Sequence, residues 1–103
     1  MTSVILALFF SISLNFRASV TGHDITFKAD SLPPGAIWEC VAVDDHHGWQ
    51  PVHCGPLFEA DREILDVWPR MPTGHYSAVL MVWTEQGTTA HMEQTPEIEV
   101  DVR

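Results

Sequence analysis

The sequence predicts an all-β domain, a small antiparallel β-sandwich of about seven strands. Apolar and polar residues alternate over short runs, and these runs are separated by turns rich in proline and glycine. The longest run, residues 76–83, is rich in β-branched and aromatic side chains and too short for a typical helix. A chain of 103 residues is long enough for one domain with its own core.

The first 22 residues support two interpretations. Residues 4–10 (V-I-L-A-L-F-F) have the length of the apolar core of a signal peptide and are too short for a membrane span. Every Asp and Glu follows Gly22, where small residues would permit cleavage, so residues 23–103 would be a secreted domain. Residues 12–20, however, alternate as a half-buried strand does. If that strand is retained, the protein is an intracellular interaction domain.

Residues 25–29 are expected to form a short strand, which ends at a break at residues 31–35 (S-L-P-P-G). Two further predicted strands follow this break. Residues 36–43 form one strand, on which Trp38 shares a face with Cys40 and Ala42. We assign that face to the core. Residues 49–54 form the other strand, and Pro51 places it at a sheet edge because proline has no N–H to donate.

The two cysteines are expected to form a disulfide. If these two strands pair as a hairpin about His47, Cys40 lies opposite Cys54, since each is seven residues from the centre. Directly opposed residues lie within about 4.5–5.5 Å, which suits a disulfide. A disulfide of this kind is typical of an oxidising compartment.

A proline-rich corner then connects residues 63–68 to the longest strand. Trp68-Pro69-Arg70-Met71-Pro72-Thr73-Gly74 cannot continue a strand, because both prolines fix φ and lack N–H donors. The strand that follows, residues 76–83, is apolar on both faces and is therefore expected at the centre of a sheet.

The stretch L-D-V-W-P-R-M-P-T-G-H-Y resembles the tyrosine-corner region of immunoglobulin-like and fibronectin type III-like sandwiches. In those domains a Gly-x-Tyr opens a central strand, and Gly74 and Tyr76 occupy the matching positions. The resemblance implies the sandwich architecture. It departs from the antibody pattern at Ala78, where that family has a cysteine.

Two strands complete the expected fold. Residues 88–94 follow a turn at Glu85-Gln86-Gly87 and form a hairpin with the long strand. Residues 97–102 alternate carboxylates with aliphatic residues, as in a terminal strand over a core. The row of acids on its outer face discourages pairing with other chains.

The composition excludes some partners and favours others. The formal net charge is −9 at pH 7, from 14 acidic and 5 basic residues. This charge disfavours nucleic acids and anionic membranes and favours a basic partner or a cation. The search for catalytic motifs finds no nucleophile elbow, phosphate-binding glycine loop or H-E-x-x-H, so no catalytic residue is assigned and the protein is not expected to be an enzyme.

Histidines suggest a metal site as an alternative to a solvated loop. His46, His47 and His53 lie close together in sequence near the hairpin, although their spacing matches no zinc pattern. Cleavage after Gly22 would also make His23 the N-terminus, where its amine and imidazole would chelate copper as in copper-dependent polysaccharide oxidases. The cofactor is thus none, or copper or zinc at one of these places.

The leading hypothesis is a secreted, acidic, non-catalytic binding module. Trp49 ends a polar loop beside His46 and His47 and is expected to be exposed, where it would anchor a protein or carbohydrate partner. The alternatives are a copper- or zinc-binding protein and an intracellular interaction domain.

Overall fold

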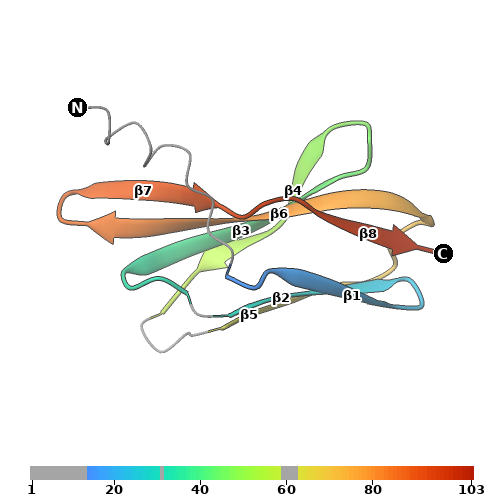
Figure 1. Ribbon diagram of the computed structural model, residues 1–103, viewed down its shortest axis with the longest axis horizontal. Coiled ribbons are helices and arrows are strands. Elements are labelled where there is room, and N and C mark those ends of the chain that lie inside the picture. The colour runs from blue at the N-terminus through green and yellow to red at the C-terminus, as the bar shows by residue number, and fades with distance from the viewer. Residues whose placement is uncertain (1–13, 31, 59–62) are drawn as a thin grey trace.

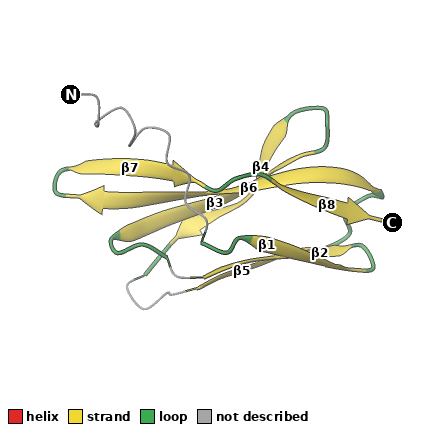
Figure 2. Cartoon of the chain, viewed as in Figure 1, coloured by secondary structure: helices red, strands yellow, loops and turns green. Residues whose placement is uncertain are grey.

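The computed structural model of the protein describes residues 14–30, 32–58 and 63–103, and the regular structure in these ranges is entirely β-strand (Figure 1, Figure 2). The strands are β1 (Arg17–Thr21), β2 (Asp24–Asp30), β3 (Ala36–Asp44), β4 (Trp49–Pro56), β5 (Glu63–Trp68), β6 (Gly74–Gln86), β7 (Thr89–Gln94) and β8 (Ile98–Val102). The all-β prediction is confirmed. Strands β2 to β8 correspond to the expected strands, and β1 overlaps residues 12–20, the alternating segment that was the alternative to a signal peptide.

The strands form two antiparallel sheets packed face to face, as the sandwich prediction requires. One sheet has the order β1-β2-β5, and the other has the order β4-β3-β6-β7, with β8 also paired to β6. Figure 1 shows the smaller sheet below the larger one. Strand β1 contacts β8 at one side of the sandwich. Strands β4 and β5 are edge strands at the other side, so the space between the sheets is open there to side chains from both.

Strand β6 is central in the larger sheet because three strands pair with it, as its apolar faces predict. The first part of β6 pairs with β8 and the last part with β7. Between these two ladders, buried Thr95 continues the pairing. Its N–H donates to the carbonyl oxygen of Leu80 at 2.9 Å, and its Oγ1 accepts the Leu80 N–H at 3.0 Å. Pro96, which has no N–H, then separates β7 from β8.

The core lies between the sheets and contains the inward residues of both. These buried residues are Phe16, Ile25, Phe27, Ala29, Leu32, Val41, Val43, Ile64, Tyr76, Ala78, Leu80, Val82, Val100 and Val102. On β8 the carboxylates face outward and the aliphatic residues inward, as predicted. In the described ranges, we find no helix with the length and apolar composition needed to cross a lipid bilayer.

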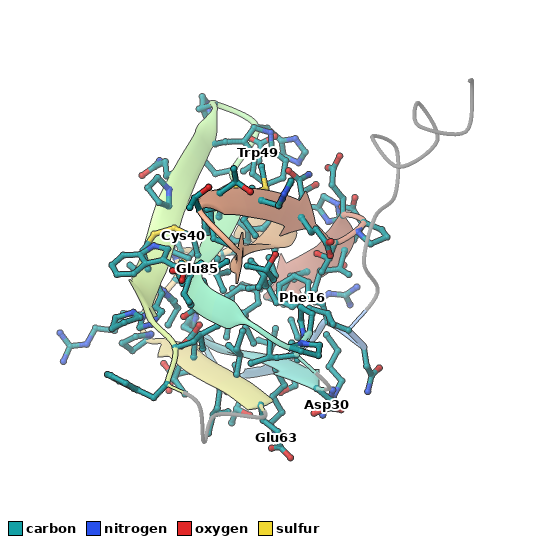
Figure 3. The ribbon with its side chains drawn as sticks, turned by 90° about the vertical axis from the view of Figure 1, so that its left-hand side faces the viewer. Phe16, Asp30, Cys40, Trp49, Glu63 and Glu85 are labelled. Atoms are coloured by element: carbon teal, nitrogen blue, oxygen red, sulfur yellow. A yellow bond between two sulfur atoms is a disulfide. The ribbon has the colours of Figure 1, made fainter. Side chains whose placement is uncertain are left out.

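The β3–β4 hairpin brings the cysteines together in the predicted register, with Cys40 opposite Cys54, although the pairing nearer the turn is shifted by one residue. Asp44 pairs with Trp49 and Ala42 with Pro51, a register that would place Cys40 opposite His53. A β-bulge beside Pro51 inserts one residue and moves Cys40 opposite Cys54. Their Cα atoms are 4.1 Å apart and their sulfur atoms lie at bonding distance; the yellow bond is visible at Cys40 in Figure 3.

The corner after β5 packs against the turn between β1 and β2. The Met71 N–H donates to the carbonyl oxygen of His23 at 2.8 Å, and His23 Nδ1 lies 2.9 Å from the Met71 carbonyl oxygen. The Tyr76 hydroxyl donates to the carbonyl oxygen of Pro72 at 2.6 Å. These bonds fix the corner where the resemblance to tyrosine-corner domains placed it. Membership of that superfamily stays a prediction.

The N-terminal part of the described chain contributes to the fold. Strand β1 pairs with β2 along its whole length, and the Phe16 ring stacks on Phe27 with 5.9 Å between ring centroids. Residues 4–10, the expected signal-peptide core, lie outside the described residues. Cleavage after Gly22 would remove β1 and Phe16, which Figure 3 shows between the sheets.

The expected inner face of β3 is wrong. Trp38 is 42% exposed and shares the outer face with Cys40 and Ala42, whereas Val41 and Val43 belong to the core. Both faces of this strand are apolar enough to be buried, so alternation gives two faces without saying which one is inward.

Candidate functional site

Two buried acids and one histidine meet at the open side of the sandwich. Glu39 lies on the inner face of β3 next to Val41, and Asp66 lies on the inner face of β5 next to Ile64. Strict alternation along each strand forces these carboxyl groups into the space between the sheets. Glu39 is 4% exposed and Asp66 is 8% exposed.

His53 on β4 lies between the two carboxyl groups. Its Nε2 is 3.1 Å from Glu39 Oε1 and 3.2 Å from Asp66 Oδ1. Gly55 is the residue directly opposite Glu39, and a Cβ built there would lie 3.7 Å from His53 Nε2. Because Gly55 has no side chain, the His53 imidazole has space to extend diagonally across the strand pair and contact Glu39. The His53 side chain is 46% exposed, so solvent reaches the cluster past its ring.

The environment of this cluster disfavours the ionised forms of both acids. Burial, together with the nearby Asp66 carboxylate, raises the pKa of Glu39 to about 8. Burial also raises the pKa of Asp66, although the His53 imidazole opposes this shift. Glu39 and His53 belong to the larger sheet and Asp66 to the smaller one, so the three side chains meet only when the two sheets pack together.

The hydrogen bonding of the two acids is incomplete. Glu39 Oε2 and Asp66 Oδ2 are buried and have no hydrogen-bond partner among the described residues. One Nε2–H of His53 cannot satisfy the oxygens of two carboxyl groups, since a neutral imidazole has a single N–H. Buried unsatisfied oxygens of this kind are uncommon and call for an explanation.

Glu39, His53 and Asp66 are also the one group of three metal-ligating side chains found in the described ranges. Their ligand atoms all lie within 4.8 Å of one another. A nitrogen and two carboxylate oxygens at this spacing can bind a divalent cation or pass a proton between them.

The other predicted histidines lie elsewhere. His46 stacks on His75 with ring centroids 5.6 Å apart, and His47 Nδ1 is 3.6 Å from Asp45 Oδ1. His75 itself contacts Glu99 through Nε2 and Asp101 through Nδ1. Its hydrogen bond with Asp101, and a second with Glu99, raise the pKa of His75. His53 is thus separated from the loop histidines with which the sequence grouped it.

His23 lies in the turn between β1 and β2, with its ring against the corner carbonyl of Met71. The copper site proposed at His23 requires cleavage after Gly22 and stays a prediction.

An apolar surface covers the outer face of the larger sheet. Trp38 on β3, Trp83 on β6 and Met92 on β7 are paired across the three strands and therefore share this face. Farther along, Trp49 is paired with Asp44 and stands at the other end of the same face. Trp49 is 46% exposed and Met92 is 48% exposed.

Between these two ends the face carries the nearly buried side chains of Ala42 and Val79 and the partly exposed Met81. A shallow depression of about 260 Å³ is lined by Ala42, Trp49, Val79, Met81, Gln94 and Glu97. We call the following set the tryptophan face: Trp38, Ala42, Trp49, Val79, Met81, Trp83 and Met92. Acidic side chains stand at its border, among them Asp44 and Glu97.

Sequence reasoning identified His53 and Trp49 but missed Glu39, Asp66 and the role of Trp38. A signal for the two acids was present. Each is a single carboxylate at the centre of an otherwise apolar strand face, as in Ile64-x-Asp66-x-Trp68. That pattern marks a buried acid, but only the packing of β5 against β3 and β4 shows that the two acids meet.

No family model matches this chain, and neither a curated protein nor a solved structure matches it.

Proposed function

We propose that this chain is a secreted, non-catalytic binding module that recognises a protein partner through the tryptophan face. The observation that carries the proposal is the exposure of Trp38, Trp49 and Met92 on one side of one sheet. The exposed face of an antiparallel sheet is ordinarily polar. Large apolar side chains exposed on such a face favour an interaction site, and tryptophan is among the residues most enriched at the energetic centres of interfaces.

Charge supports a basic protein as the partner. The chain has a net charge of −9, and Asp44 and Glu97 border the tryptophan face. A partner with an apolar centre and a rim of Lys and Arg would complement both features. Attraction of this kind steers association and weakens as the salt concentration rises.

Secretion is the second element of the proposal. The cysteine sulfur atoms lie at bonding distance, and disulfides persist mainly in oxidising compartments. The described fold includes β1, so the proposal requires that an exported chain keep Phe16 to Gly22. Cleavage after Gly22 would remove β1 and make β2 an edge strand, paired with β5 on one side only.

Photo-crosslinking tests the proposed interface. A photoreactive phenylalanine analogue is placed at Met92, and a matched analogue is placed at Leu65, which is apolar and 63% exposed on the smaller sheet. Both proteins are incubated with extracellular fluid, and cross-linked proteins are identified by mass spectrometry. We expect a basic protein that cross-links at Met92 and not at Leu65.

The identified partner is then produced and its affinity measured by calorimetry. Trp38→Ala and Trp49→Ala should each weaken binding at least tenfold, and Leu65→Ala should not. Equal cross-linking at both positions, or unchanged affinity of both tryptophan variants, would refute the interface. If the protein binds a glycan on an array, and the same glycan in solution quenches its tryptophan fluorescence, the partner is a carbohydrate and not a protein. A concentration-dependent dimer would replace it with a second copy of the chain.

A further inference from the structure

We propose that Glu39, His53 and Asp66 form a zinc-binding site that joins the two sheets at the open side of the sandwich. The proposal does not depend on the tryptophan face, because the three residues lie on the inner faces and edge of the sandwich and not on its outer surface. It rests on donor chemistry, ligand spacing and two buried oxygens without partners.

The donor set suits zinc. One imidazole nitrogen and two carboxylate oxygens are standard zinc ligands, whereas calcium takes six to eight oxygens and magnesium keeps several waters. Copper favours sites with more nitrogen, and only one histidine reaches this cluster. The fourth tetrahedral position would point to the solvent that reaches the half-exposed His53 ring.

The spacing is already close to that of a coordinated ion. Zinc with ligands at about 2.0–2.1 Å in a tetrahedron keeps neighbouring ligand atoms roughly 3.3–3.4 Å apart. His53 Nε2 is 3.1 Å from Glu39 Oε1 and 3.2 Å from Asp66 Oδ1. These two distances are within a few tenths of an ångström of the tetrahedral spacing, and all three ligand atoms lie within 4.8 Å of one another.

The independent observation is the pair of buried oxygens without partners. Both carboxyl groups are more than nine-tenths buried, and Glu39 Oε2 and Asp66 Oδ2 accept no hydrogen bond from the described residues. Two acids brought together in the same interior repel one another when both are ionised. A divalent cation would remove this repulsion by coordinating both carboxylates.

The position also explains what zinc would do for the fold. Strands β3 and β4 belong to the larger sheet and β5 to the smaller one, and no backbone pairing connects β4 to β5. The bond between Cys40 and Cys54 links β3 to β4 within one sheet. Zinc would add a link across the interior, at the side opposite the contact between β1 and β8.

Calorimetric titration of the full chain with zinc chloride tests the site. We expect one equivalent of zinc to bind with a micromolar or lower dissociation constant. Asp66→Asn, Glu39→Gln and His53→Gln should each weaken binding at least tenfold, since even partners of metal ligands contribute ten- to a hundredfold. His47→Gln is the matched control, because His47 lies nearby in sequence and does not reach the cluster.

Two further measurements separate loss of the site from loss of the fold. The thermal midpoint of the wild type should rise with zinc concentration, and that of each ligand variant should not. Cobalt, used in place of zinc, should give the visible absorption of a tetrahedral ion with the wild type alone. His53→Gln changes a half-exposed side chain and is therefore expected to fold. It still tests zinc binding if Glu39→Gln or Asp66→Asn, which change buried side chains, fails to fold.

The outcomes are distinct from those of the interface experiment. Binding weaker than millimolar, or binding that survives in all three ligand variants, would overturn the proposal. So would binding that is lost in His75→Gln and kept in His53→Gln, because the ion would then lie at the Glu99 and Asp101 carboxylates.

Discussion

The hydroxyl of Tyr76 donates a 2.6 Å hydrogen bond to the main-chain carbonyl oxygen of Pro72, four residues earlier in the chain. This bond closes the corner between β5 and β6. The Tyr76 ring is buried, and its Cζ and Oη lie 3.6 Å from where a Cβ would stand at Gly74. The bond and the ring packing together hold the corner against the first residues of the central strand.

Removal of this hydroxyl should destabilise the fold modestly. Tyr76→Phe keeps the ring and removes only the hydrogen bond, so we expect the free energy of unfolding to fall by about 1 kcal/mol. Urea unfolding followed by tryptophan fluorescence measures the change. An unchanged midpoint would mean that water replaces the hydroxyl at the Pro72 carbonyl without cost.

The cysteine pair should contribute more. Cys40 and Cys54 are separated by 14 positions, and closing a loop of this length stabilises a protein by about 3 kcal/mol in the chain-entropy model. The double variant Cys40→Ala/Cys54→Ala should lose that amount in denaturant unfolding. Reductant should destabilise the wild type similarly and leave the double variant unaffected. If reductant does not shift the wild type, the two thiols are not bonded in solution.

His75 provides a pH-dependent contribution to stability. Hydrogen bonds with Asp101 and Glu99 raise the pKa of His75, and the bond to His75 lowers the pKa of Asp101. The imidazolium therefore stabilises the fold fully below the ordinary histidine pKa, and this stabilisation is lost as pH rises through the raised value. The carboxylate of Asp101 contributes above its ordinary pKa and loses its contribution as pH falls through the lowered one. His46, which is also titratable, stacks on the His75 ring.

Comparison of the wild type with His75→Gln isolates this effect. We expect the difference in thermal midpoint to be largest near pH 5.5 and to vanish well above the raised pKa of His75. His91→Gln, in the exposed strand β7, is the control. A difference that stays constant from pH 5.5 to pH 9 would show that the ring acts through packing and not through its charge.

The two buried acids should reduce the stability of the metal-free protein. Apolar replacement of buried charged groups often stabilises a fold by about 1–4 kcal/mol. We therefore expect Glu39→Met/Asp66→Leu to raise the free energy of unfolding in the presence of a chelator by roughly 1–2 kcal/mol. Chemical unfolding in the same buffer provides the comparison. A clear loss of stability would mean that the acids support the fold even without a cation.

The sequence was informative about elements and less so about their relationships. Alternation and turn residues located β2 to β8, because these patterns are local. The pairing of Cys40 with Cys54 followed from the predicted hairpin register, although a bulge beside Pro51, which alternation does not reveal, shifts the pairs nearer the turn. Local patterns also allowed either face of β3 to be inward, and the expected face was the wrong one.

The candidate site was harder to predict for a physical reason. His53, Glu39 and Asp66 come from three strands and both sheets, so their contact depends on sheet order and on how the sheets pack. Neither property has a periodic signal in the sequence. A lone acid on an apolar strand face gives a useful warning of burial, but it does not identify the residue that it will meet.

The last prediction concerns the N-terminal strand. The Phe16 side chain is buried against Phe27, and β1 pairs with β2 from Arg17 to Thr21. Phe16→Ala should therefore lower the free energy of unfolding by about 3 kcal/mol, as for other buried phenylalanines. Val20→Ala, an exposed position on β1, is the control and should cost far less.

Intact mass of the chain exported from eukaryotic cells complements this variant. Because β1 and Phe16 belong to the packed structure, we expect the exported protein to retain Phe16 to Gly22 and to be two hydrogens lighter before reduction. A mass that begins at His23, together with a Phe16→Ala variant as stable as the wild type, would show that the mature domain folds without β1. The N-terminal amine would then lie beside the His23 imidazole, and the copper titration of that chain would become the decisive measurement.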